Sequence, residues 1–139
     1  MTENQQPVEI LESNSNPDPF VVGVVADTHI PDRVNALHPL LPDELSQHRV
    51  QLILHAGDLS TMAVVRTLEK IAPVLAVTGN RDFLLRKEIP MKQHLKIYGN
   101  EVVLAHGHIS PGIYWADKLE YITHGYSFDR YQQRLARLY

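Results

Sequence analysis

The sequence contains no cysteine, which excludes disulfide bonds, thiolate metal sites and cysteine nucleophiles. Any bound metal ion must therefore be held by His, Asp, Glu or Asn side chains. A surplus of positive charge is also missing, since 13 Lys and Arg stand against 16 Asp and Glu. Because nucleic acids and anionic membranes select basic surfaces, the sequence predicts neither as a partner.

Long hydrophobic segments are absent as well. The longest apolar run, residues 20–26, is far shorter than the roughly 20 residues that span a bilayer. The amino terminus lacks a basic start followed by an apolar stretch, so it does not have the pattern of a secretory signal. The sequence therefore predicts a cytoplasmic protein with no membrane segment.

Length and composition favour one folded domain. The 139 residues are 44% hydrophobic and 21% charged, which is typical of a globular chain that buries a core. Residues 1–19 are rich in Asn, Gln, Glu and Pro and show no periodic pattern, so we expect a flexible tail there. The folded domain is expected over residues 20–139.

Short runs of Val, Leu and Ile recur along the chain, and each ends in a cluster of polar residues and glycine. Continuous apolar runs are typical of strands that are covered on both faces, which indicates an α/β fold. The four runs with their clusters are FVVGVVA before DTHIPDR, VQLILHA before GDLS, PVLAVT before GNRD, and EVVLA before HGHISPG.

Helices and a hairpin are predicted between and after these runs. Residues 60–72 have apolar side chains at helical spacing with Ser60 or Thr61 as N-cap, and residues 42–49 favour a shorter helix. Residues 91–105 alternate around a Gly-Asn pair, which is typical of two antiparallel strands. One or two helices are expected in the carboxyl-terminal part, the last with a common apolar face made of Phe128, Tyr131, Leu135 and Leu138.

The polar clusters share a chemistry. In open α/β sheets, ligands bind outside the carboxyl ends of the strands, so neighbouring strands would bring these clusters to one crevice. Carboxylate, imidazole and amide oxygen together suit Mn, Fe, Zn or Ni, and one carboxylate between two such groups can bridge two cations. The side chains gathered in this way are Asp27, His29, Asp58, Asn80, His106 and His108.

The ordered motifs DTH, GD, GNRD and HGH resemble those of the calcineurin-type metallophosphoesterase superfamily, specifically its small bacterial and archaeal phosphodiesterase branch. The resemblance covers roughly residues 20–108. It implies a β-sandwich flanked by helices (αββα) and two divalent metal ions, Mn first and Fe, Ni or Zn as alternatives. It also implies the ligands, with Asp27 and His29 on the first metal, Asp58 bridging both, and Asn80 and His106 on the second.

The reaction implied by the resemblance is hydrolysis of a small-molecule phosphodiester or phosphomonoester by a hydroxide that bridges the two metals. His108 would face the substrate, and Asp82 would orient a ligand or a water. Arg81 stands where many relatives place histidine. Because a guanidinium does not donate a proton at ordinary pH, Arg81 would bind phosphate if it points inward, and Arg33 could do the same.

Each motif alone also has a structural explanation. Asp-Thr-His after a strand can cap a loop, Gly-Asp, Gly-Asn and His-Gly-His can form turns, Asp82 can cap its own turn, and loop arginines are usually solvated. Only the ordered combination favours a site. The histidines outside the motifs are expected to be structural or solvated: His38, His48, His55, His94 and His124.

One motif of the family is missing. The sequence contains no G-H-x-H, which in relatives supplies one further histidine to each metal, and the one histidine beyond HGH, His124, falls in a predicted helix. Three explanations are open: a fragment of a longer gene product, a short protein that repairs the gap by association, or a protein that has lost activity. In each case we expect the sandwich to be incomplete at its carboxyl-terminal end.

Two consequences follow for partners and function. A remnant with one sheet would expose apolar surface, which predicts a homo-oligomer or low solubility. The loss of G-H-x-H also keeps alternatives to the enzyme open: a catalytically impaired protein that serves as a protein-binding scaffold, or a metal or nucleotide sensor without turnover.

Overall fold

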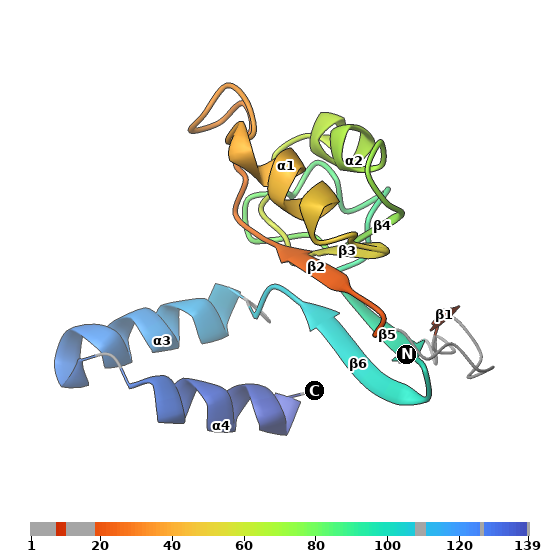
Figure 1. The fold of residues 1–139 in the computed structure, drawn as a ribbon. Coiled ribbons are helices and arrows are strands. Elements are labelled where there is room, and N and C mark those ends of the chain that lie inside the picture. Colours follow the sequence, from red (N-terminus) through yellow and green to blue (C-terminus); the bar gives the residue numbers. More distant parts are fainter. Residues whose placement is uncertain (1–7, 11–18, 108–110, 126, 139) are drawn as a thin grey trace. The chain divides into compact units, whose positions relative to one another are not determined.

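The computed structural model describes residues 8–10, 19–107, 111–125 and 127–138 (Figure 1). The chain forms two compact units, Met1–His106 and Gly107–Tyr139. The motif residues up to His106 all belong to the first unit, whereas predicted site residue His108 lies outside the described residues.

The first sheet of the amino-terminal unit is parallel, in the order β2-β3-β4. It consists of β2 (Val22–Val25), β3 (Leu52–His55) and β4 (Val74–Ala76). Val25 pairs with His55, and His55 pairs with Ala76, so the three carboxyl ends lie side by side. The predicted meeting of the first three polar clusters at one sheet edge is therefore confirmed.

Two helices connect these strands. Helix α1 (Leu40–Gln47) begins after Pro39 and carries Pro42 in its first turn. Main-chain nitrogens in the first turn have no intrahelical partner, so the missing N–H of proline costs no hydrogen bond there. Helix α2 (Met62–Leu68) begins at Thr61, whose side chain accepts a hydrogen bond from the Ala63 nitrogen at 3.3 Å. Both helices lie over one face of the parallel sheet (Figure 1), and their buried side chains Leu45, Val65 and Leu68 pack in one cluster with Ile53 of β3.

The second sheet has the order β1-β5-β6. Strands β5 (Lys92–Ile97) and β6 (Asn100–Ala105) form the predicted antiparallel hairpin. The turn residues are Tyr98 and Gly99, one position before the expected Gly-Asn pair, and both have positive φ, 49° and 78°. Positive φ at two successive turn residues matches the twist of the paired strands, which is why glycine is favoured there.

A second hydrophobic cluster lies between the two sheets. Leu54 and Val77 from the parallel sheet pack with Leu95 and Leu104 of the hairpin. The unit is thus layered as helices, parallel sheet and mixed sheet, which confirms the predicted α/β class and its two-sheet sandwich with helices on the parallel sheet. The expectation of a single remaining sheet is wrong, because the hairpin already supplies a second apolar face.

The predicted unstructured tail contains one short strand. β1 (Val8–Ile10) pairs in parallel with β5, with Val8 opposite Leu95 and Ile10 opposite Ile97. Main-chain hydrogen bonds to an open sheet edge hold these three residues, and such pairing requires little from the sequence itself. The expectation of a structureless tail is therefore wrong for this strand.

The carboxyl-terminal unit consists of two helices, α3 (Pro111–His124) and α4 (Phe128–Leu138). Gly125, at φ 74°, ends α3, and its nitrogen donates to the Tyr121 carbonyl. On the predicted apolar face of α4, Tyr131 and Leu135 are half-buried and Phe128 is exposed. Within the described part of the chain, no helix is long and apolar enough to cross a membrane. The cytoplasmic location stays a prediction.

Candidate metal centre

The loops that follow β2 and β3 run together as a short main-chain ladder. The nitrogens of Asp27, His29 and Ile30 donate to the carbonyls of residues 57, 58 and 59, at 3.0, 3.0 and 3.1 Å. Asp27, His29 and Asp58 all have positive φ, between 47° and 56°. L-residues rarely adopt this conformation, and it persists where surrounding contacts enforce it, often at functional sites.

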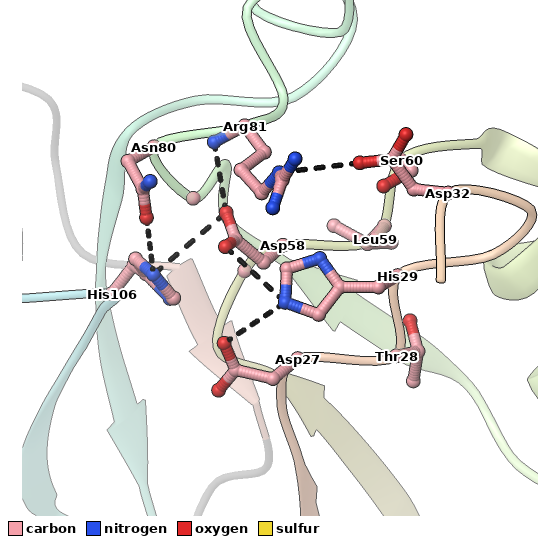
Figure 2. A network of polar contacts seen from close by, with 12 residues as sticks. Asp27, Thr28, His29, Asp32, Asp58, Leu59, Ser60, Asn80, Arg81 and His106 are labelled. Carbon is pink, nitrogen blue, oxygen red and sulfur yellow. Dashed lines mark hydrogen bonds and ion pairs between the residues drawn. The ribbon is translucent and has the colours of Figure 1, made fainter. Parts of the chain in front are cut away.

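The first ligand group consists of Asp27, His29 and Asp58 (Figure 2). The His29 Nε2 lies 3.6 Å from an oxygen of each carboxylate. One ligand atom from each residue falls within 4.8 Å of the other two, so the three could hold one ion. His29 Nδ1 is buried and has no hydrogen-bond partner among the described residues, so the polar contacts that orient this ring lie on the Nε2 side.

A second group forms on the other side of Asp58. His106 Nε2 lies 3.2 Å from the Asn80 side-chain oxygen and 3.8 Å from Asp58 Oδ1. Its Nδ1 lies 2.7 Å from the Ala56 carbonyl, which can only accept, so Nδ1 donates there and a neutral ring would offer its Nε2 lone pair to a cation. His106 follows β6, so the fourth polar cluster reaches the site from the second sheet rather than from the parallel one.

Asp58 is the shared residue of the two groups. Its side chain is buried, with Oδ2 toward His29 and Oδ1 toward His106. Gly79 leaves the space for this carboxylate, since a Cβ at that position would overlap the side chain and main-chain nitrogen of Asp58. Carboxylates and neutral imidazoles are the donors that Mn, Fe and Zn prefer, and one carboxylate oxygen for each group suits a bridge. The residues therefore fit two divalent cations.

Asp82 is almost completely buried, at 1% exposure, and binds main chain rather than a ligand side chain. Its carboxylate accepts hydrogen bonds from the nitrogens of Leu59, Ser60 and Gly79, at 3.1, 2.7 and 2.8 Å. The side chain therefore ties the loop after β3 to the loop after β4. The predicted orienting of a ligand or water stays a prediction, and the observed contacts are those of a loop anchor.

Arg81 contributes its main chain and its side chain in different places. Its nitrogen donates to Asp58 Oδ1 at 2.9 Å, which adds a fixed hydrogen bond to the shared carboxylate. The guanidinium extends toward Asp32 of the loop after β2, with Nε 3.2 Å from Oδ2 (Figure 2). Both side chains are partly exposed, so the pair is accessible to solvent and to an anionic ligand.

His55 is the residue whose part in the site the motifs did not reveal. It ends β3, is fully buried, and contacts Thr28 between Asp27 and His29. Burial lowers the pKa of His55 from 6.5 to about 4, opposed by the negative charges of Asp82, Asp27 and Asp58 and reinforced by His106. The ring is therefore neutral at ordinary pH. A histidine inside a continuous apolar strand run was the one available signal.

Comparison with known proteins assigns the family. The model of the calcineurin-like phosphoesterase superfamily domain matches residues 20–138. The chain belongs to this superfamily. A probable metallophosphoesterase of Methanothermobacter thermautotrophicus is 40% identical over 92 residues, which are 66% of this chain and 52% of that protein. A second, of Methanocaldococcus jannaschii, is 36% identical over 90 residues, 65% of this chain and 44% of that protein.

The chain thus spans about half the length of the curated relatives that it matches. Among solved structures, Vps29 of Chaetomium thermophilum superposes with a TM-score of 0.58 at 24% identity, over 73% of this chain and 57% of that one. A Vps29 single mutant of Entamoeba histolytica gives 0.54 at 27% identity, over 70% and 58%. These likenesses support the metallophosphoesterase fold, and the family uses divalent metals.

Proposed function

We propose that this chain is a metal-dependent phosphoesterase that hydrolyses a small-molecule phosphodiester or phosphomonoester. The observation that carries the proposal is the buried Asp58 carboxylate, which presents one oxygen to His29 and the other to His106. Asp27 and His29 would complete one cation site, and Asn80 and His106 the other. When bound, two divalent cations, Mn in the first instance, would lower the pKa of water toward neutrality and neutralise charge on the phosphoryl oxygens.

Hydrogen bonds within the protein keep the ligands in place. The Arg81 nitrogen donates to Asp58, while Asp82 anchors the two loops that carry Asp58 and Asn80. The Arg81 guanidinium is proposed to exchange its partner Asp32 for a substrate phosphate, because both are anions and the Arg81 and Asp32 side chains are both partly exposed. His108 is proposed to face the substrate.

The test is calorimetric titration of metal-stripped protein with Mn(II), comparing Asp58→Asn with Asp43→Asn, a matched change at an exposed position on α1. We expect two ions per chain for the parent and the control. Asp58→Asn should weaken both ions, because the variant loses the shared charge and one oxygen. Hydrolysis of bis(p-nitrophenyl) phosphate and p-nitrophenyl phosphate then separates diesterase from monoesterase action, and should fall at least about 100-fold in Asp58→Asn.

A second candidate function is a protein-binding scaffold that keeps the fold without turnover. The likeness of the fold to the Vps29 structures is the observation that favours it. The two functions are distinguished by the same titration. If the parent shows no saturable Mn(II) binding, the enzyme is rejected and the scaffold remains. If the parent binds two Mn(II) ions tightly and hydrolyses the esters, the scaffold is rejected.

A further inference from the structure

His55 contacts both loops that carry the first ligand group. It is the last residue of β3, and its side chain is at 0% exposure. Its Nδ1 lies 3.2 Å from the Gly57 nitrogen, and its Nε2 lies 3.1 Å from Thr28 Oγ1. Thr28 lies between Asp27 and His29 in the chain, and Gly57 directly precedes Asp58.

The two contacts determine the tautomer. A main-chain N–H can only donate, so Nδ1 must accept the hydrogen bond from Gly57 and cannot carry a proton. The proton of the neutral ring is then on Nε2, which donates to the Thr28 hydroxyl. One ring thus uses its acceptor for one loop and its donor for the other.

We propose that His55 is a positioning residue for metal binding, which holds the Asp27–His29 loop through Thr28 and the Asp58 loop through Gly57. This inference rests on the proposed function, since it concerns the same cations. It differs from the structural role expected for this histidine from sequence, because its two contacts are divided between the elements whose ligands must converge.

Backbone conformation explains why such a residue is needed. Asp27, His29 and Asp58 are left-handed, a conformation that residues other than glycine rarely adopt, and Gly57 has a φ of 101°. A loop under this strain relaxes unless hydrogen bonds oppose it. A buried ring with neither nitrogen exposed can do so without introducing a charge behind the two carboxylates, and its lowered pKa keeps it neutral.

The experiment uses variants that keep one contact each. In His55→Asn the side-chain oxygen can take the place of Nδ1 and accept from Gly57, whereas in His55→Gln the amide nitrogen can take the place of Nε2 and donate to Thr28. Mn(II) titration of the full chain should show affinity lowered about 10- to 100-fold in both variants. His48→Gln, at an exposed position just after α1, should bind Mn(II) like the parent.

A cycle with Thr28 separates positioning from general stability. Thr28→Val should weaken Mn(II) binding when made in the parent. The same change should not weaken binding further in His55→Asn, which already lacks the Thr28 contact. Thr28→Ser keeps the hydroxyl and should bind Mn(II) with parental affinity. In metal-free protein, long-range proton–nitrogen NMR spectra should show His55 with its proton on Nε2. This spectrum and the Thr28 variants decide the question even if a His55 variant does not fold.

Three results would overturn the inference: a proton on Nδ1, Thr28→Val weakening both backgrounds equally, or His55 variants that bind Mn(II) like the parent. Each leaves the proposed function intact, because the parent still binds metal. Failure of the parent itself to bind Mn(II) rejects the proposed function and, with it, the inference.

Discussion

Left-handed backbone occurs in two parts of the amino-terminal unit for different reasons. At the hairpin tip, Tyr98 and Gly99 adopt it because a two-residue turn between twisted strands requires it. In the loops after β2 and β3, Asp27, His29 and Asp58 adopt it although none of the three is glycine.

The difference lies in what holds the conformation. The tip is a local structure, and a Cβ at Gly99 would meet nothing within 4 Å. The site loops are held by each other's carbonyls, by Asp82 through Leu59 and by His55 through Thr28, in contacts between residues more than 20 positions apart. At the hairpin tip, the left-handed conformation serves only to reverse the chain. In the site loops, tertiary contacts hold the left-handed conformation, and it directs the ligand side chains toward one point.

The largest expected effect comes from adding one methyl group against the Asp58 carboxylate, compared with one at the hairpin tip. Gly79→Ala should lower the free energy of unfolding by more than about 3 kcal/mol and abolish tight Mn(II) binding, because its Cβ overlaps the Asp58 carboxylate. Gly99→Ala should cost about 1 kcal/mol, from its φ of 78° alone, and leave metal affinity unchanged. Urea unfolding and calorimetry measure both. Equal effects of the two variants would remove the distinction between the regions.

Acid should destabilise the site loops through His55. The pKa of His55 in the folded chain is lowered to about 4. Between pH 6.5 and 4, this histidine is therefore protonated in the unfolded chain but neutral in the folded chain. Stability should therefore fall as the pH drops from 6.5 to 4, by up to about 3 kcal/mol from this group. His55→Gln should lose this part of the pH dependence, and His94→Gln, on strand β5 of the hairpin, should retain it. Urea unfolding at several pH values tests this, and parallel curves for all three proteins would contradict it.

Asp82→Asn should cost about 2 kcal/mol, because one of three main-chain donors would then face an amide N–H₂. Loosening of the loop should also weaken Mn(II) binding, although Asp82 contributes no ligand atom in the structure. Glu101→Gln, an exposed change on β6, is the matched control and should alter neither property. Lower stability with unchanged metal affinity would show that the anchor does not act on the site.

The smallest expected effect is a gain. Ser60 has a φ of 69°, and its buried hydroxyl has no hydrogen-bond partner among the described residues. Ser60→Gly keeps the main-chain hydrogen bond to Asp82 and should raise the free energy of unfolding by about 1 kcal/mol. Thermal unfolding measures the gain. A loss of stability instead would mean that the strain in this loop is not relieved by glycine.

Much of the fold followed from local patterns. The apolar runs predicted β2, β3 and β4, the spacing from Met62 to Leu68 predicted α2, and the alternation after Met91 predicted the hairpin. Strand β1 escaped prediction because three residues pairing at a sheet edge carry almost no pattern of their own. The role of His55 was not predicted, because a histidine at the end of a buried strand gives the same sequence pattern whether or not it contacts a distant loop.

The sequence alone determined the α/β class, the order of the motifs and the residue types available for metal binding, because periodicity and side-chain chemistry are properties of short segments. Only the tertiary structure decided that Asp58 turns one oxygen to His29 and the other to His106, that Asp82 anchors main chain, and that Arg81 extends toward Asp32. These choices depend on contacts between residues more than 20 positions apart, which form only when the strands and loops have packed.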